Sequence, residues 1–447
     1  MPAIPELLLP AGSVAKMHKA YDFGADAVYA GQPRYSLRAR NNDFTSLLML
    51  EEGITQAQAR GKRFYVASNI YAHNAKLKTY MADMEPVIAM QPDALIMADP
   101  GLIMMVRDKW PDMPIHLSVQ ANAINWADVR FWQRIGLSRI ILSRELSLEE
   151  IAEIRQQCPD MELEVFVHGA LCVAYSGRCL LSGYFNRRDS NQGTCTNSCR
   201  WNYAIHSAEE NETGDILPVS MSPVMEEAHP AFSALGQAPR HPLADKAYLI
   251  EEGKRAGQLM PIMEDEHGTY ILNSKDLRAV EHIAELVKIG VDSLKIEGRT
   301  KSIYYVARTA QVYRKAIDDA VTGKPFDETL LGALQGLANR GYTDGFYKRH
   351  HTHEYQNYLT GASELHNSHY VGDVEHIENG WATVIVKNRF SIGDRLEILH
   401  PGGNDVVTLQ AMTNTDGEPL TVAPGSGHVV RIPLDAKWDK ALLARLL

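Results

Sequence analysis

The stretch ELLLPAGSVAKMHKAYDFGADAVYAG, residues 6–31, carries the pattern that decides the fold. Two short apolar runs, Glu6–Leu9 and Ala27–Ala30, enclose a stretch of helical length, Ser13–Phe23. A strand, a helix and a second strand in this order form a β–α–β unit, whose strands lie parallel. We therefore predict an α/β fold that begins near the start of the chain.

The same alternation continues through the first two-thirds of the chain. Stretches of helical length, such as Leu148–Gln157, separate most of the later apolar runs. The later candidate strands are Arg63–Ser68, Ala94–Ala98, Ile115–Val119, Arg139–Leu142, Leu163–Val167, Tyr270–Leu272 and Ser293–Ile296. About eight or nine such units favour a closed or distorted barrel of the TIM type. A doubly wound parallel sheet fits nearly as well.

Composition divides the chain further. We predict a TIM-barrel-like catalytic domain over residues 1–330, with an insertion at about 205–265, where Gly, Pro, Ser and acidic residues show little periodicity. Short apolar runs with Gly-Asp and Gly-Gly turns then predict a small all-β barrel over residues 366–447. Residues 331–365 are predicted to be a linker.

The bulk composition limits the class of protein. The 447 residues are 45% hydrophobic with a mean hydropathy of −0.24, values of an ordinary globular protein. No apolar run approaches the roughly 20 residues that span a bilayer, and no secretory signal is visible, so we predict a cytoplasmic protein without a membrane partner. A net charge of −10 argues against a protein that covers long stretches of nucleic acid without sequence specificity, but it is compatible with a local basic patch.

Four of the five cysteines fall within one short stretch. They are Cys172, Cys179, Cys195 and Cys199. Four soft thiolate ligands suit an iron–sulfur cluster or zinc. The irregular spacing favours an iron–sulfur cluster, since structural zinc more often has two close pairs. A third interpretation is that the four cysteines are redox-active thiols that bind no metal. The fifth cysteine, Cys158, is expected to be a thiol packed in the core.

The loop between these cysteines is cationic. It contains Arg178 and Arg188, and Arg200 follows the last cysteine. Arginines bind carboxylates and phosphates in bidentate fashion, so these three are candidate substrate-binding residues. The alternative is that they compensate the negative charge of a thiolate cluster.

Two further groups of candidate residues lie at predicted strand ends. Strand alternation puts Lys295, Glu297 and Arg299 on one side of Ser293–Arg299, where they form either a site or a structural ion pair. His168 follows an apolar run and precedes Cys172 by four residues. It donates a proton or orients a substrate, or else it is a hydrogen-bonded core histidine.

Polar residues or glycines also follow the other strands, as the rim of a site requires. They include Gly31, Asn69, Asp99, Gln120 and Ser143. Beyond Tyr29 and Gly31 come Arg34, Tyr35, Arg38 and Arg40, which either contact an anionic substrate or a base, or form a solvated loop.

Several of these blocks together resemble peptidase family U32. The blocks are Val165–Cys172, Tyr175–Cys179, Arg188–Asp189, Asn191–Gly193, Cys195–Arg200, Glu6–Gly12, Asp26–Gly31 and Ser293–Arg299. The resemblance covers about residues 5–330 and the family's C-terminal β-domain. Despite the family's name, it implies oxygen-independent hydroxylation by a protein with a 4Fe–4S cluster, acting on tRNA, ribosomal RNA or a quinone precursor.

The tRNA branch of the family implies specific roles for these residues. Its product is 5-hydroxyuridine at the wobble position, with prephenate, a dicarboxylate, as hydroxyl source. Cys172, Cys179 and Cys195 would bind the cluster, and Cys199 is the candidate for the fourth ligand because no cysteine follows it. Three cysteine ligands and an open iron site are the alternative. The resemblance does not identify an electron donor.

If the chain hydroxylates tRNA as the resemblance implies, the candidate catalytic residues are His168, Lys295 and Glu297. Arg299 joins the loop arginines as a candidate for binding substrate.

Two other functions stay open. The first is a metal-dependent peptidase of the collagenase-like type, although the chain contains no His-Glu-x-x-His motif and no Gly-x-Ser-x-Gly elbow. The second is a zinc-stabilised RNA-binding adaptor, which metal analysis separates from an iron–sulfur protein.

Overall fold

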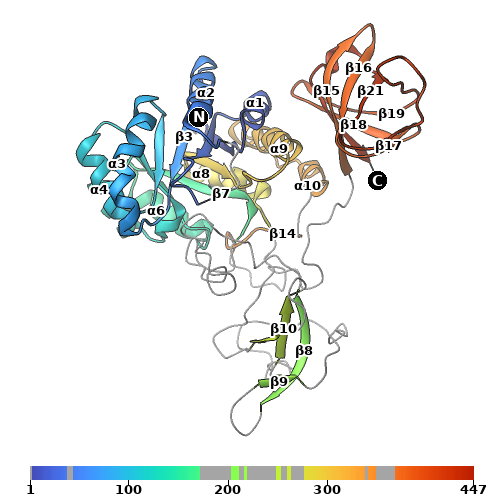
Figure 1. The fold of residues 1–447 in the computed structure, drawn as a ribbon. Coiled ribbons are helices and arrows are strands. Elements are labelled where there is room, and N and C mark those ends of the chain that lie inside the picture. The colour runs from blue at the N-terminus through green and yellow to red at the C-terminus, as the bar shows by residue number, and fades with distance from the viewer. Residues whose placement is uncertain are drawn as a thin grey trace.

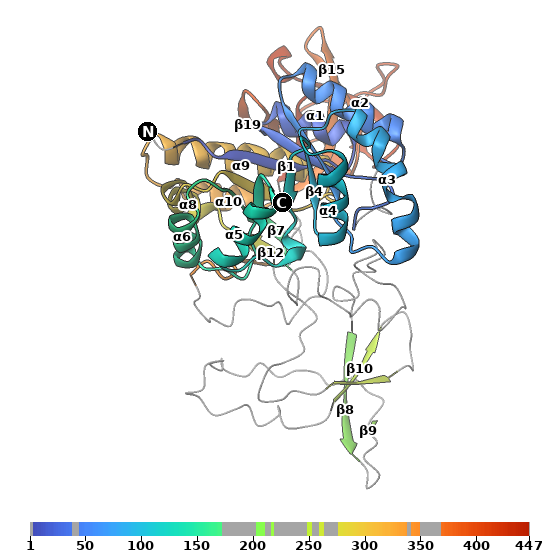
Figure 2. The same ribbon diagram turned by 90° about the vertical axis from the view of Figure 1, so that its left-hand side faces the viewer.

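A computed structural model describes residues 3–37, 44–171, 203–210, 216–218, 248–252, 259–262, 276–337, 341–348 and 368–446. Eight parallel strands close into a barrel (Figures 1 and 2). They are β1 (Glu6–Pro10), β2 (Ala27–Gly31), β3 (Arg63–Ser68), β4 (Ala94–Met97), β5 (Ile115–Leu117), β6 (Arg139–Ile141), β7 (Glu162–Ala170) and β13 (Ser293–Ile296).

The last of these strands closes the barrel. β13 pairs with β1 on one side, with Leu8 opposite Lys295, and with β7 on the other, with Glu164 opposite Ser293. This confirms the prediction of a TIM-like barrel over the alternative of a doubly wound sheet. The strands are almost wholly buried because helices cover the barrel outside and side chains fill it inside.

Helices follow most strands and begin where the sequence supplies a cap. Ser13, Ser46 and Ser147 each accept a hydrogen bond from a backbone N–H of the first turn, and Glu150 completes a capping box. The helices are α1 (Val14–Asp22), α2 (Leu47–Ala59), α3 (Asn74–Ala89), α4 (Pro100–Lys109), α5 (Trp126–Ile135), α6 (Leu148–Gln157), α8 (Ile283–Ile289), α9 (Ile303–Val321) and α10 (Thr329–Gln335). Short 3₁₀ turns lie at Val119–Ala121 (η2), Val280–His282 (η5) and Ala436–Trp438 (η6).

Two additional strands extend the barrel sheet. β12 (Asp276–Arg278) pairs antiparallel with the end of β7, and β14 (Tyr342–Thr343) pairs with β12. The candidate strand at Tyr270–Leu272 lies outside the described residues.

The region expected to be an aperiodic insertion contains a four-stranded antiparallel sheet. Its strands are β8 (Tyr203–Glu210), β9 (Ile216–Pro218), β10 (Tyr248–Glu252) and β11 (Leu259–Ile262), in the order β11-β10-β8-β9. In the sequence, 29 residues separate β9 from β10, and periodicity alone did not reveal that the two belong to one sheet.

The C-terminal region is antiparallel and all-β, as predicted, with its own apolar core. Its main sheet has the order β19-β18-β22-β15-β16-β21. The strands are β15 (Ser368–Glu378), β16 (Trp381–Val386), β17 (Phe390–Ser391), β18 (Arg395–His400), β19 (Gly403–Thr408), β20 (Val422–Ala423), β21 (Val429–Pro433) and β22 (Leu442–Leu446).

This all-β region packs against helix α9 of the barrel. The rings of Tyr304 and Tyr370 stack with their centroids 5.4 Å apart, and Arg308 forms a buried ion pair with Glu397. Leu399 and Leu442 belong to the main hydrophobic core. Within the described part of the chain, no helix is both long and apolar enough to cross a membrane.

Candidate functional site

Buried charged side chains form a continuous network across the interior of the barrel. Arg139 of β6 donates from Nη1 to Glu6 Oε1 of β1 over 2.6 Å and to Glu164 Oε2 of β7 over 3.2 Å. β7 and β13 separate β6 from β1, so the contact between Arg139 and Glu6 crosses the interior. Lys295 Nζ of β13 donates to Glu164 Oε1 over 2.7 Å. The network thus pairs each buried cation with a carboxylate.

Burial and neighbouring charges shift the pKa values of these groups in opposite directions. Burial alone would raise the pKa of the Glu6 carboxyl, but Arg139 and hydrogen bonds from Tyr65 and Ser293 hold it below its ordinary value. Burial lowers the pKa of Lys295, and the carboxylate of Glu164 opposes that shift. The Glu164 carboxylate therefore favours the charged form of Lys295 inside the barrel.

Tyr29 joins Lys295 to Glu297 at the carboxyl end of the barrel. Lys295 Nζ lies 4.5 Å from the centroid of the Tyr29 ring, and the Tyr29 hydroxyl donates to Glu297 Oε2 over 3.1 Å. Burial raises the pKa of Tyr29 well above its ordinary value, and the Glu297 carboxylate adds to the shift. The phenol therefore keeps its proton and presents it to Glu297. This end of the barrel combines a cation, a hydrogen-bond donor and a half-buried carboxylate.

Arg299 is buried beside the end of β2. A Cβ added to Gly31 would lie 2.4 Å from Arg299 Nη1 and 2.3 Å from Ser36 Oγ. Glycine at position 31 is therefore what lets the guanidinium approach the backbone of β2. The structure thus places Lys295, Glu297 and Arg299 around β2 at one end of the barrel, and their roles in a reaction stay predictions.

Polar side chains link other strand ends around the same rim. Asn69 Nδ2, after β3, donates to Ser118 Oγ, after β5, over 3.4 Å. Ser118 in turn donates to Gln120 Oε1 over 3.1 Å, and the Tyr71 hydroxyl donates to the Gln120 carbonyl over 3.1 Å. Asn69 and Gln120 therefore belong to a connected polar rim, as their positions after predicted strands indicated.

Arg144 is a rim residue that the sequence reasoning missed. Its guanidinium lies 3.8 Å from the centroid of the Phe166 ring and donates to the Ala170 carbonyl over 3.1 Å. Lys295 Nζ lies 5.4 Å from the same Phe166 ring. The signal was available, because a cation directly follows Ser143 at the end of a predicted strand.

His168 faces the helix layer. The pairing of β7 with β13 shifts register, so that Phe166 lies opposite Lys295 but His168 lies opposite Ile296. This β-bulge adds one residue to β7 and turns His168 toward α9, where its Nδ1 lies 3.2 Å from the Tyr313 hydroxyl. Burial lowers the pKa of His168 to about 3, so the ring is neutral. The geometry matches the core-histidine reading, and the catalytic role stays a prediction.

The predicted cluster ligands and loop arginines lie outside the described residues. They are Cys172, Cys179, Cys195, Cys199, Arg178, Arg188 and Arg200. Leu171, the last described residue before them, is buried at the carboxyl end of β7. Four thiolates remain a donor set that suits iron. Among the residues the structure does describe, no three His, Cys, Asp or Glu side chains are grouped to bind a metal, and Cys158 is a buried free thiol, as expected.

Of the residues after β2, the structure describes Arg34 and Tyr35, and both side chains contact helix α3. Tyr35 is fully buried, with its hydroxyl 2.9 Å from Thr79 Oγ1, and Arg34 pairs with Asp83 over 2.6 Å. Arg38 and Arg40 lie outside the described residues.

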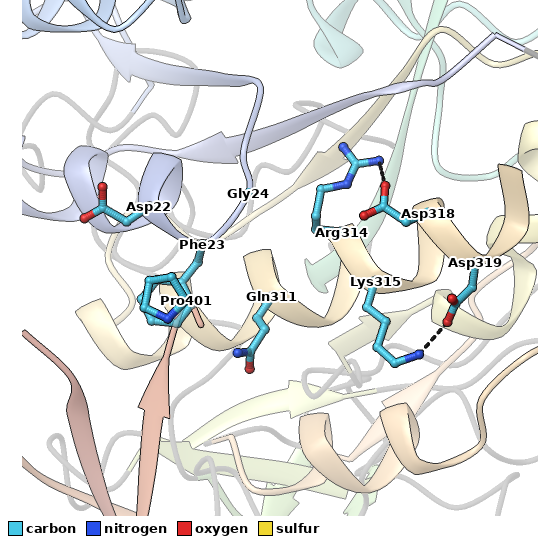
Figure 3. Close-up of a pocket in the computed structure, with 9 residues that line it drawn as sticks. All are labelled: Asp22, Phe23, Gly24, Gln311, Arg314, Lys315, Asp318, Asp319 and Pro401. Atoms are coloured by element: carbon cyan, nitrogen blue, oxygen red, sulfur yellow. Dashed lines mark hydrogen bonds and ion pairs between the residues drawn. The ribbon is translucent and has the colours of Figure 1, made fainter. Parts of the chain in front are cut away.

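A separate crevice of about 400 Å³ lies between α1, α9 and Pro401 (Figure 3). Its two cations are already paired, Arg314 with Asp318 over 2.7 Å and Lys315 with Asp327 over 3.1 Å. The crevice therefore offers little uncompensated charge to a ligand.

The fold and the rim define a parallel (β/α) barrel protein with a polar, partly cationic site at the carboxyl ends of its strands. Residues 12–357 match the description Peptidase family U32, and residues 366–445 match Peptidase family U32 C-terminal domain. The chain belongs to peptidase family U32, which confirms the resemblance seen in the sequence blocks.

Named relatives match the chain over nearly its whole length. It is 58% identical over 444 residues to tRNA hydroxylation protein P of Escherichia coli, covering 99% of this chain and 96% of that protein. It is 55% identical over 448 residues to the protein of the same name from Haemophilus influenzae, with the same coverage. A 23S rRNA 5-hydroxycytidine synthase of Escherichia coli is 27% identical over 457 residues, covering 98% of this chain and 60% of that protein.

Proposed function

We propose that this chain is an RNA-modifying protein that hydroxylates tRNA. The observation that carries the proposal is the 58% identity, over 99% of the chain, to a tRNA hydroxylation protein. The more distant relative is named for making a hydroxylated base in ribosomal RNA. Both names describe hydroxylation of RNA, and a barrel rim rich in polar groups is a suitable place for such a reaction.

The finer proposal is that the product is 5-hydroxyuridine at the wobble position. A wobble base lies in a single-stranded loop, so it is free to leave its stack and enter a pocket. Prephenate or a similar dicarboxylate would be the source of the hydroxyl group. Lys295 and Arg299 are two of the described cations at this end of the barrel, and their charge fits an anionic substrate.

Glu297 and Lys295 are suited to assist this reaction in different ways, Glu297 with a proton and Lys295 with its charge. Glu297 is half-buried and accepts a hydrogen bond from the Tyr29 hydroxyl. Tyr29 therefore orients the Glu297 carboxylate, which would accept a proton during the reaction. Lys295, held by Glu164, supplies positive charge to anionic groups near the Tyr29 ring.

We also propose a 4Fe–4S cluster as cofactor. Cys172, Cys179, Cys195 and Cys199 would bind it. When bound, such a cluster supplies one-electron redox chemistry, which makes hydroxylation without molecular oxygen feasible. Arg178, Arg188 and Arg200 would bind the dicarboxylate or a phosphate of the RNA near the cluster.

The function is tested in a bacterial strain that lacks its own tRNA hydroxylation proteins. Expression of this chain, with and without oxygen, should restore 5-hydroxyuridine to tRNA, measured by mass spectrometry of digested nucleosides. A strain that expresses the folded chain but has no 5-hydroxyuridine in either condition would contradict the proposal.

The cofactor is tested separately on protein purified without oxygen. Iron and acid-labile sulfide should be present in roughly equal amounts, as a 4Fe–4S cluster requires, and should be lost in Cys172→Ser. Zinc without sulfide would instead support the RNA-binding adaptor. Peptide cleavage that disappears in Cys172→Ser would support the peptidase.

A further inference from the structure

The outward face of helix α5, together with the residue just before its N-cap, carries exposed apolar and basic side chains, which we call the α5 stripe. Its members are Ile124, Trp126, Arg130, Phe131, Arg134 and Ile135. Of the twelve exposed large apolar side chains among the described residues, four lie between positions 124 and 135. The exposed fraction reaches 55% for Phe131. Such clustering marks an interaction surface more often than a scatter of single exposed residues does.

The exposure of the stripe does not come from a poorly formed helix. Asn125 caps the first turn by accepting from Asp128 N, and Gly136 ends the helix in the left-handed conformation with φ of 90°. Val129 and Trp132 on the opposite face are buried in the barrel core. The stripe is therefore the free side of a rigid, fully docked helix.

The arginines of the stripe keep their charge available. The Arg130 guanidinium lies 4.8 Å from the centroid of the Trp126 ring and donates to the Gln157 carbonyl, which is neutral. Arg134 is exposed and forms no ion pair with the described residues. The only acidic residue on the helix, Asp128, already accepts a hydrogen bond from Asn125 Nδ2 over 2.9 Å. The stripe itself therefore carries two positive charges in a chain of net charge −10.

The stripe begins near the rim of the barrel. Gln120, in the polar rim, is four residues before Ile124, so the two are within about 14 Å of each other. Helix α5 has 10 residues and is about 15 Å long. That length equals about four base steps of an RNA or DNA strand, at roughly 3.4 Å per step. Figure 2 shows α5 beside α6 on the outside of the barrel.

We propose that the α5 stripe binds the tRNA loop and adjoining backbone while the target base occupies the rim. Exposed aromatic rings stack on unpaired bases, and free arginines contact phosphates, so this combination fits RNA better than an uncharged protein surface. The proposal rests on the proposed function and adds to it the surface that the RNA contacts.

The test measures binding of a fluorescein-labelled anticodon stem-loop with an unmodified wobble uridine. Arg134→Glu and Phe131→Ala should each weaken binding by about five-fold or more, and Arg134→Glu should also reduce the dependence of the Kd on salt. Lys288→Glu is the matched control. Lys288 is likewise an exposed basic residue in the last turn of an outer helix that ends in a left-handed glycine, and its change should alter the Kd by less than about two-fold.

The outcomes separate this proposal from the proposed function. Binding by the wild-type chain that Arg134→Glu weakens no more than Lys288→Glu would overturn the α5 stripe as the RNA surface and leave the proposed function standing. No binding by the wild-type holoprotein would count against both. A dimer in light scattering that Phe131→Ala converts to a monomer, at unchanged RNA affinity, would assign the stripe to self-association and overturn the proposal.

Discussion

Arg139 connects two carboxylates that come from different strands of the barrel, Glu6 of β1 and Glu164 of β7. Burial alone would lower its pKa, but the charges of Glu6 and Glu164 raise it above the ordinary value. The net contribution of such a buried ion pair to the free energy of unfolding is small. The free energy lost when the arginine leaves water is about as large as the free energy gained when it pairs with the carboxylates. Removal of Arg139 is different, because the two carboxylates would be left buried next to each other.

We predict that Arg139→Ala lowers the free energy of unfolding by about 3–5 kcal/mol, measured by urea denaturation. Arg60→Ala is the comparison. Arg60 pairs with Asp22 at the surface, with both side chains over one-third exposed, and its loss should cost no more than about 1 kcal/mol. Equal losses in the two variants would show that the interior network is not buried as described.

His168 predicts a pH dependence of stability. Its pKa is about 3 in the folded chain, against 6.5 for an ordinary histidine, so between these values the unfolded chain binds more protons. The contribution of His168 to the free energy of unfolding is therefore complete above about pH 6.5. As the pH falls further, this contribution decreases by about 1.4 kcal/mol per pH unit. His116, buried beside Arg139 and Lys295, acts in the same direction.

Unfolding at about pH 7.5 and pH 5.5 checks this prediction. The loss of stability on acidification should be smaller in His168→Phe than in the wild type by about 1 kcal/mol, because phenylalanine fills the site without titrating. The remaining loss comes from His116 and other groups. An identical pH dependence in the two proteins would mean that His168 is accessible to protons.

At the scale of elements, the bulge in β7 directs the chain at the carboxyl end of the barrel. Gly169 has φ of 107°, and a Cβ there would lie 2.6 Å from the Glu297 carbonyl. The Glu297 backbone N–H in turn donates to the His168 carbonyl over 2.8 Å. The bulge therefore holds together β7, which leads to the cysteine segment, and the strand end that carries Glu297.

Gly169→Ala should lower the free energy of unfolding by more than about 2 kcal/mol, because both backbone strain and the clash with Glu297 oppose it. Gly61→Ala provides the control. Gly61 also has a positive φ, 64°, but a Cβ there meets nothing within 4 Å, so only the strain of about 1–2 kcal/mol remains. Equal effects in thermal or urea unfolding would contradict the close approach of Gly169 to Glu297.

The elements show which features the sequence could predict. Most strand positions follow from apolar runs, because a parallel barrel buries both faces of each strand. The number of units only favoured a barrel over a doubly wound sheet, and closure itself shows in the pairing of β13 with β7. The partner of Lys295 could not be predicted, since Glu164 becomes its neighbour only when β13 pairs with β7. The direction of His168 was equally hidden, because strict alternation after Phe166 would have turned it toward the interior and the bulge has no sequence signature of its own.

At the scale of the whole molecule, the all-β region is fixed to the barrel by a mixed interface. Arg308 of α9 donates to the Tyr304 hydroxyl over 3.0 Å and pairs with Glu397 of β18. Gln311 Nε2 donates to the His400 carbonyl over 3.1 Å. The contacts of Arg308 with Glu397 and of Gln311 with His400 join residues 89 positions apart, so sequence patterns that identified each domain gave no information on how they pack.

Arg308→Ala should loosen this interface and leave Glu397 without its cation. We expect the free energy of unfolding to fall by about 3 kcal/mol, and the all-β region to unfold in a separate calorimetric step. Lys387→Ala is the control, since Lys387 pairs with Asp373 on a partly exposed surface of the all-β region. A single transition with unchanged midpoint in Arg308→Ala would contradict a stabilising role of the interface.

The most direct measurement concerns the barrel rim itself. In the strain lacking its own tRNA hydroxylation proteins, 5-hydroxyuridine in tRNA is measured with the wild-type chain, Glu297→Gln or Glu162→Gln. Glu162 undergoes the same change at the opposite, amino end of the barrel, where it pairs with Arg139. We predict that the wild type and Glu162→Gln restore the modified base, while Glu297→Gln reduces it at least about ten-fold at equal protein level. Full restoration by Glu297→Gln would contradict the assignment of the reaction to this site.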